Sequence, residues 1–299
     1  MISSNRARSR RKAAKAVLAG TLLSVPLWAQ PKADTPELAI VEAVVSQYED
    51  GPPPGPSYRH YPGETIYLAF RIQGYKREEK QDERSFVKLS WRVELRDGSN
   101  RLVVEPGSGK VDGELAEQDK EWKPKQHWQA LLPPLMPSGV YKLAITLTDE
   151  FARRETSRTL TVPVDGYDVE PSPELTVRNI RYYRSEPNGQ TPPLEQAIYR
   201  RGDVLWALFD ITGYRFGPNH RFEVTYGIEV LRADGSRVFQ QEEAARLAEA
   251  NFYPKRAVPG TFSLTVSPEV AKGTYTVVLR VRDVTGNQYH ESRSSFVVE

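Results

Sequence analysis

The feature that most constrains this fold is an internal repeat. Residues 63–75, GETIYLAFRIQGY, align without a gap on residues 202–214, GDVLWALFDITGY, and residues 139–149 align on residues 273–283. Shorter landmarks recur in the same order: Glu37-Leu38 and Glu174-Leu175, Asp97-Gly98-Ser99 and Asp234-Gly235-Ser236, Leu115-Ala116-Glu117 and Leu247-Ala248-Glu249, Pro124-Lys125 and Pro254-Lys255. This ordered series predicts a tandem duplication of a unit of roughly 125–130 residues.

Within each unit, apolar residues alternate with more polar ones. Apolar positions of this kind are Ile66, Leu68, Phe70 and Ile72; Leu205, Ala207, Phe209 and Ile211; Tyr141, Leu143, Ile145 and Leu147; and Tyr275, Val277, Leu279 and Val281. A period of two is typical of antiparallel strands that bury one face and leave the other in water. The Asp-Gly pairs are hairpin signals. We expect about seven strands per unit, and two packed sheets would bury both apolar faces.

Three segments depart from this pattern. Gln240–Ala250 is rich in Glu, Ala, Arg and Leu, and a short helix is expected there. Its counterpart, Gly113–Trp122, is more polar and is expected to be a looser insertion. Residues 107–110, GSGK, are interpreted as a turn, because a phosphate-binding loop needs Ser or Thr where Val111 stands. The expected fold class is all-β, with short helical or loop insertions.

Two short motifs carry a resemblance to a known family. The Gly-x-Tyr step that opens residues 139–149 and 273–283, followed by aliphatics ending in Asp, resembles the penultimate strand of bacterial immunoglobulin-like domains. The Glu-Leu openings, each followed by Pro-rich sequence and a Gly-Glu or Gly-Asp step, resemble cell-adhesion-related (CARDB-like) repeats of that class. The resemblance implies two tandem antiparallel immunoglobulin-like β-sandwiches that serve adhesion or spacing. The expected boundaries are 37–164 and 174–299, joined by a Pro-containing linker at 165–173.

The N-terminus reads as an export signal over residues 1–29. A basic stretch is followed by an apolar run from Ala16 to Ala29, which is shorter than the roughly 20 residues that span a membrane. Cleavage after Ala29 is expected, with an uncleaved anchor as the rival interpretation. Arg10-Arg11 leaves twin-arginine export open beside the Sec route. The mature chain is expected in the periplasm or at the cell surface, without a membrane span.

The leader also dominates the charge. It holds six of the 41 basic residues and none of the 39 acidic ones, so its removal changes the net charge from +2 to −4. A chain of mixed charge near neutrality lacks the basic footprint of nucleic-acid binding, and no nucleic-acid partner is expected.

Few residues are available for catalysis or metal binding. The absence of cysteine excludes disulfides, thiolate nucleophiles and Cys-ligated metals. The four histidines form no close-spaced pair and are predicted to be surface or loop residues. Carboxylates in the linker suggest a calcium site, weighed against a merely hydrophilic linker: Asp165, Asp168 and Glu170. No cofactor is expected, and the chain is expected not to be an enzyme.

Aromatic residues are the main candidates for a binding face. Tyr67 and Trp206 occupy equivalent outward positions of their strands. They are expected to lie under the extra segments 107–126 and 240–258, which carry Trp122 and Phe252, although a ligand-binding face is the alternative. Further candidates for such a face are Tyr75, Tyr214, Tyr182 and Tyr183.

The sequence favours a non-enzymatic exported protein that binds, adheres or spaces, with a protein or a cell-envelope glycan as partner. Two alternatives stay open. One is a carbohydrate-binding module, which the outward aromatics favour. The other is a small extracytoplasmic hydrolase, which would need a catalytic cluster in one unit that the other lacks.

Overall fold

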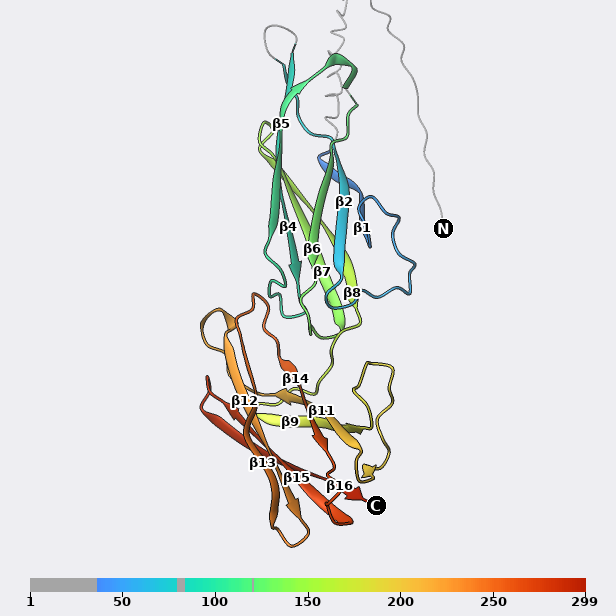
Figure 1. Cartoon of the computed structure of the whole chain (residues 1–299). Coiled ribbons are helices and arrows are strands. Elements are labelled where there is room, and N and C mark those ends of the chain that lie inside the picture. Colours follow the sequence, from blue (N-terminus) through green and yellow to red (C-terminus); the bar gives the residue numbers. More distant parts are fainter. Residues whose placement is uncertain (1–36, 80–83, 120) are drawn as a thin grey trace, which may run out of the picture. The chain divides into compact units, whose positions relative to one another are not determined.

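The computed structural model describes residues 37–79, 84–119 and 121–299, all within the compact unit Pro36–Glu299. The predicted signal peptide, residues 1–29, lies outside the described residues. We refer to residues 37–164 as the first half and to residues 174–299 as the second half (Figure 1).

The first half consists almost entirely of antiparallel strands. Its elements are β1 (Ala39–Ser46), β2 (Thr65–Gln73), β3 (Glu78–Glu79), β4 (Ser85–Arg96), β5 (Gly107–Leu115), a 3-10 turn (Glu117–Asp119), β6 (Lys125–Leu131), β7 (Gly139–Asp149) and β8 (Arg154–Val164). One sheet has the order β1–β2–β6. The other has the order β3–β4–β7–β8, with β5 paired to β4.

The second half contains β9 (Thr176–Tyr183), β10 (Ile198–Tyr199), β11 (Val204–Thr212), a 3-10 turn (Pro218–His220), β12 (Phe222–Arg232), β13 (Arg237–Glu249), β14 (Ala257–Thr265), β15 (Gly273–Asp283) and β16 (Gln288–Val298). Its sheets have the orders β9–β11–β14 and β10–β16–β15–β12–β13. Apart from the two-residue strands β3 and β10, the two halves connect seven strands in the same order.

The alternation of the sequence explains which face of each strand is buried. In β2 every second residue, from Ile66 to Ile72, is buried, and in β15 Tyr275 and Val281 belong to the equivalent buried face. In each half, side chains from both sheets join one apolar cluster. The chain is therefore all-β and sandwich-like, as predicted. Among the described residues, no helix is long and apolar enough to cross a membrane.

Two of the three segments are strands instead. Gln240–Ala250, predicted as a helix, lies almost wholly within β13, which pairs with β12 from Phe222 to Leu231. The supposed turn at residues 107–110 is the start of β5. In both cases the edge of a sheet supplies backbone partners, and this tertiary pairing overrides local helix or turn preference. Gly113–Trp122 leaves β5 after Leu115 and continues into the 3-10 turn Glu117–Asp119, so most of it is irregular, as expected.

Candidate functional site

In each half, one side of the sandwich-like arrangement is closed and the other is open. On the closed side, Arg158 Nη1 of β8 donates to the carbonyl of Ile40 in β1 at 3.0 Å, and Tyr182 in β9 is hydrogen-bonded to Ser294 in β16. On the opposite side lie β5 and β6, or β13 and β14. In the described part of the chain each of these four strands pairs with a single neighbour, so its outer edge is free.

Two indoles fill the open side of the first half. A Cβ atom at Gly107 would lie 2.1 Å from Cδ1 of Trp128, and one at Gly109 would lie 2.3 Å from Cζ2 of Trp91. Only glycine fits at such close approach. Trp91 Nε1 also donates to Gln126 Oε1 at 2.8 Å, which links the two sheets.

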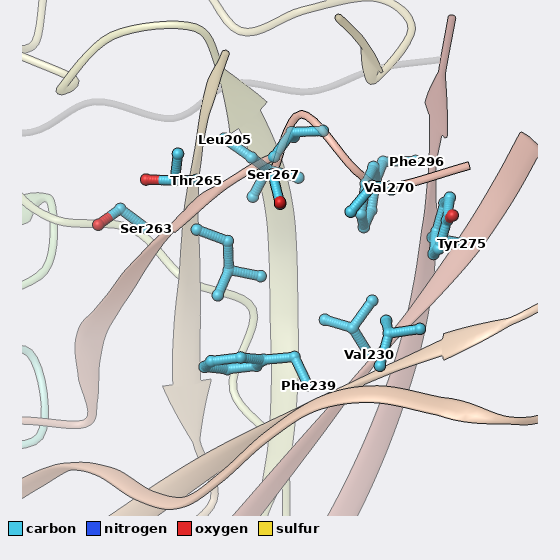
Figure 2. A pocket seen from close by; sticks show the side chains of 12 residues that line it. Leu205, Val230, Phe239, Ser263, Thr265, Ser267, Val270, Tyr275 and Phe296 are labelled. Carbon is cyan, nitrogen blue, oxygen red and sulfur yellow. The ribbon is translucent and has the colours of Figure 1, made fainter. Parts of the chain in front are cut away.

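The open side of the second half contains a groove, here called the β13–β14 groove (Figure 2). It encloses about 430 Å³ and is mainly apolar. Figure 2 shows Phe239 and Val230 on one side and Val270 on the other. Val238 and Phe239 are 38% and 39% exposed at its rim. Four hydroxyl side chains line it, those of Ser263, Thr265, Ser267 and Tyr275, and the last donates its hydroxyl to the carbonyl of Ala271.

A second hollow, here called the aromatic pocket, lies at β6 in the first half. It encloses about 520 Å³ and is lined by Glu49, Asp50, Tyr67, Leu68, Trp91, Gly107, Ser108, His127, Trp128 and Gln129. Asp50 is hydrogen-bonded to Lys125, and its carboxylate Oδ1 lies 3.5 Å from Nδ1 of His127. The hydrogen bond from Lys125 lowers the pKa of Asp50 below its usual range. The pocket therefore combines aromatic rings with ionised and polar groups.

Tyr67 and Trp206 lie as the alternation predicts, on the outward faces of β2 and β11, and both are half-buried. Trp122 and Phe252, which the expected covers carry, are themselves 42% and 48% exposed. Trp122 follows β5 and Phe252 follows β13. Tyr67 lines the aromatic pocket together with Gly107 and Ser108 from the start of the segment 107–126.

The other candidate aromatics are buried and do not form an exposed face. Tyr75, Tyr214, Tyr182 and Tyr183 are each 8% exposed or less. Tyr75 donates its hydroxyl to the carbonyl of Trp122 at 2.7 Å, and Tyr214 donates to the carbonyl of Lys255. Burial raises the pKa of both tyrosines. The hydroxyls of Tyr75 and Tyr214 are bound by segments that lie more than 40 residues further along the chain, and no local sequence pattern reveals such contacts.

The linker carboxylates are separately engaged. Asp168 accepts from the backbone N–H of Ser138 at 2.9 Å, and Glu170 pairs with Arg178 at 3.3 Å, while Asp165 is exposed. No group of three or more His, Asp or Glu side chains among the described residues is arranged to hold a metal ion.

One histidine corrects the expectation of surface positions. His60 is 2% exposed, with Nδ1 3.2 Å from Oε1 of Glu64 and its ring edge-on to Tyr58 at 5.0 Å. Its backbone N–H donates to the carbonyl of Pro163 in β8. His60 therefore anchors the long loop between β1 and β2 to the sheet.

The chain was compared with known protein families, curated proteins and solved structures. No known family matches the chain, and no curated protein matches it. Among solved structures, a family 123 glycoside hydrolase from Clostridium perfringens, described in a study of glycolipid glycan hydrolysis, matches at 10% identity and a TM-score of 0.28. The match covers 42% of this chain and 27% of the hydrolase.

The matched protein is a hydrolase, which runs against the expectation that the chain is not an enzyme. At a TM-score of 0.28 the match assigns no activity to this chain, and neither an enzymatic nor a non-enzymatic role follows from it. The described residues form an all-β, sandwich-like protein, with the aromatic pocket at the open side of the first half and the β13–β14 groove at the open side of the second.

Proposed function

We propose that the chain is an exported binding protein made of two duplicated immunoglobulin-like domains, at 37–164 and 174–299, joined by the linker 165–173. It acts in the periplasm or at the cell surface, in adhesion or in spacing other components. The observation that carries this proposal is the identical order in which the seven long strands of each half connect.

Equivalent hydrogen bonds support the duplication. Tyr141 and Tyr275, both 3% exposed, each donate their hydroxyl at 2.7 Å to the carbonyl four residues earlier, at Pro137 and at Ala271. A tyrosine that bonds back to nearby upstream backbone is also a feature of immunoglobulin-like sandwiches, where it fixes a corner.

The β13–β14 groove is the proposed partner site, and the proposed occupant is an extended segment of another protein. The outer edges of β13 and β14 have no strand partner, so a segment can pair along them outside Thr261, whose N–H and C=O are hydrogen-bonded to the hydroxyl of Tyr226. Alternate apolar side chains of the segment would enter the cavity beside Val230 and Phe239. Backbone pairing would provide affinity, and the cavity would select the side chains.

Site-directed photo-crosslinking in the native cell envelope tests this proposal. A photoreactive phenylalanine analogue at Phe239 should give a discrete product, whereas the same analogue at Tyr289, which is 60% exposed on β16, should not. The partner segment identified by mass spectrometry should bind the full chain as a synthetic peptide. Phe239→Asp should abolish that binding. The proposal fails if both positions give the same products or if the peptide binds the variant equally well.

A further inference from the structure

The aromatic pocket offers flat apolar surface beside open polar groups. Tyr67 is half-buried and lines the pocket from the outward face of β2. Gln129 and His127 of β6 share that face, because Gln129 is the register partner of Tyr67 and His127 is the partner of Ala69. Trp128 is the partner of the buried Leu68 and packs against the core on the other face. The pairing of two strands in a sheet therefore holds the Tyr67 ring beside Gln129 and His127 without any contribution from a loop.

Polar groups with both donors and acceptors lie around the ring of Tyr67. Ser108 and Gln129 are exposed, and the side chain of His127 is 39% exposed. The carboxylate of Asp50, 51% exposed, is already held by Lys125 and keeps accessible oxygen for a further donor. Glu49, also exposed, adds a second carboxylate.

This combination matches one ligand chemistry. The C–H faces of a sugar ring pack on aromatic rings, and its hydroxyls are bound by carboxylate, amide and imidazole side chains. Pockets of this type bind through apolar and aromatic walls with a few placed polar groups. Two carboxylates at the rim disfavour phosphates and acidic sugars, because like charges repel.

We propose that the aromatic pocket binds an uncharged saccharide, with the ring of Tyr67 as the packing surface and Asp50, His127 and Gln129 as hydroxyl partners. This site lies in the first half, and it is independent of the β13–β14 groove proposed above for a protein partner.

Isothermal titration calorimetry of the full chain against cello-, chito-, xylo-, manno- and laminari-oligosaccharides tests the proposal. At least one should bind. Tyr67→Ala should weaken that binding at least about tenfold, the loss expected when a stacking surface is removed. Tyr61→Ala is the matched control, because Tyr61 is 56% exposed in the same half and does not line the pocket.

Gln129→Ala and His127→Ala provide a second test that does not depend on an aromatic ring, since both side chains are exposed and their loss should not affect folding. Each should also weaken binding, whereas Phe239→Asp in the groove should leave it unchanged. The proposal is overturned if none of the oligosaccharides binds at millimolar concentration. It is equally overturned if binding survives in Tyr67→Ala, Gln129→Ala and His127→Ala alike.

Discussion

A buried carboxylate in the second half gives the sharpest test of how the fold is held together. Asp283, at the end of β15, is 0% exposed. Its Oδ2 accepts from the backbone N–H of Arg215 at 2.8 Å and from Nε2 of Gln288 at 2.9 Å, and its Oδ1 accepts from the N–H of Gly286 at 2.8 Å. One side chain thus joins the β15–β16 turn to the segment after β11.

Asp283→Asn should therefore destabilise the protein well beyond an ordinary surface change. The amide replaces one oxygen with an NH₂ group, which must face at least one N–H donor and cannot accept from it. Each lost bond to a charged acceptor is worth about 1.5–3 kcal/mol, so the free energy of unfolding should fall by about 2–4 kcal/mol. Urea unfolding followed by circular dichroism measures this difference.

Asp234→Asn is the matched control, because Asp234 is exposed in the β12–β13 turn and the amide oxygen can still accept from the N–H of Ser236. Its free energy of unfolding should equal that of the unsubstituted protein within experimental error. Asp149, also 0% exposed, accepts from the N–H groups of Lys76 and Ala152, and Asp149→Asn should behave like Asp283→Asn. If Asp283→Asn unfolds within error of the control, the reasoning about its three donors is wrong.

Four further predictions follow from the sequence and the structure. The exported protein should begin at Gln30, and mass spectrometry that finds the initiator methionine retained would contradict cleavage. Fragments 37–164 and 174–299 should each melt cooperatively when expressed alone, because units of this size bury about two-thirds of their unfolded surface; a fragment without a transition would refute the two-domain division. Trp206→Ala should cost about 1–3 kcal/mol in thermal unfolding, less than the 3–5 kcal/mol of a fully buried aromatic, because Trp206 is half-buried. Burial alone would raise the pKa of Glu64, but its hydrogen bonds outweigh burial and hold the pKa below the usual 4.5. The stabilisation from this carboxylate is therefore present above pH 4.5 and is lost as the pH falls through the pKa of the folded state. Glu64→Gln should reduce the loss of stability at acidic pH, measured by urea unfolding at a series of pH values.

The strands with clear alternation could be predicted because burial on one face leaves a direct trace in the sequence. In β2 the buried set Ile66, Leu68, Phe70 and Ile72 is the one that the period of two identified. The Asp-Gly turns were equally readable, because Asp97 and Asp234 each accept the N–H two residues ahead, at 2.9 Å. These signals are local, and a single sequence contains them in full.

Edge strands left no such trace. Most residues of β13 are exposed, so its composition reports solvent contact and resembles that of a surface helix. Its pairing with β12 depends on backbone groups that every sequence possesses, and the pattern could not reveal it.

Only part of the aromatic pocket could be predicted from the sequence. Tyr67 was identified by its outward position, whereas Trp128 was missed, because its place depends on the close approach of Gly107 from a strand that was interpreted as a turn.

The two halves bridge their open sides in related ways. In the first, Trp91 of β4 donates to the side chain of Gln126 in β6. In the second, Tyr226 of β12 donates to the carbonyl of Thr261 in β14 at 2.7 Å. Both bonds join an inner strand of one sheet to the edge strand of the other, where no backbone pairing connects the sheets. A polar aromatic suits this position, because its ring fills the core while its single donor reaches the opposite strand.

The neighbouring strand then determines what kind of hollow remains. In the first half, Gly107 and Gly109 leave room for indoles, and the pocket beside them is lined by aromatic and polar groups. In the second half the register of β12 and β13 shifts after Tyr226, and a Cβ atom at Gly227 would lie 2.1 Å from the carbonyl oxygen of Glu242. A bulge of this kind re-aims the side chains that follow it, and β13 presents Phe239 to an apolar groove. Because Phe239 in the groove and His127 and Gln129 in the pocket are exposed at the edge, substitutions of these side chains in one hollow should leave both the fold and the other hollow intact.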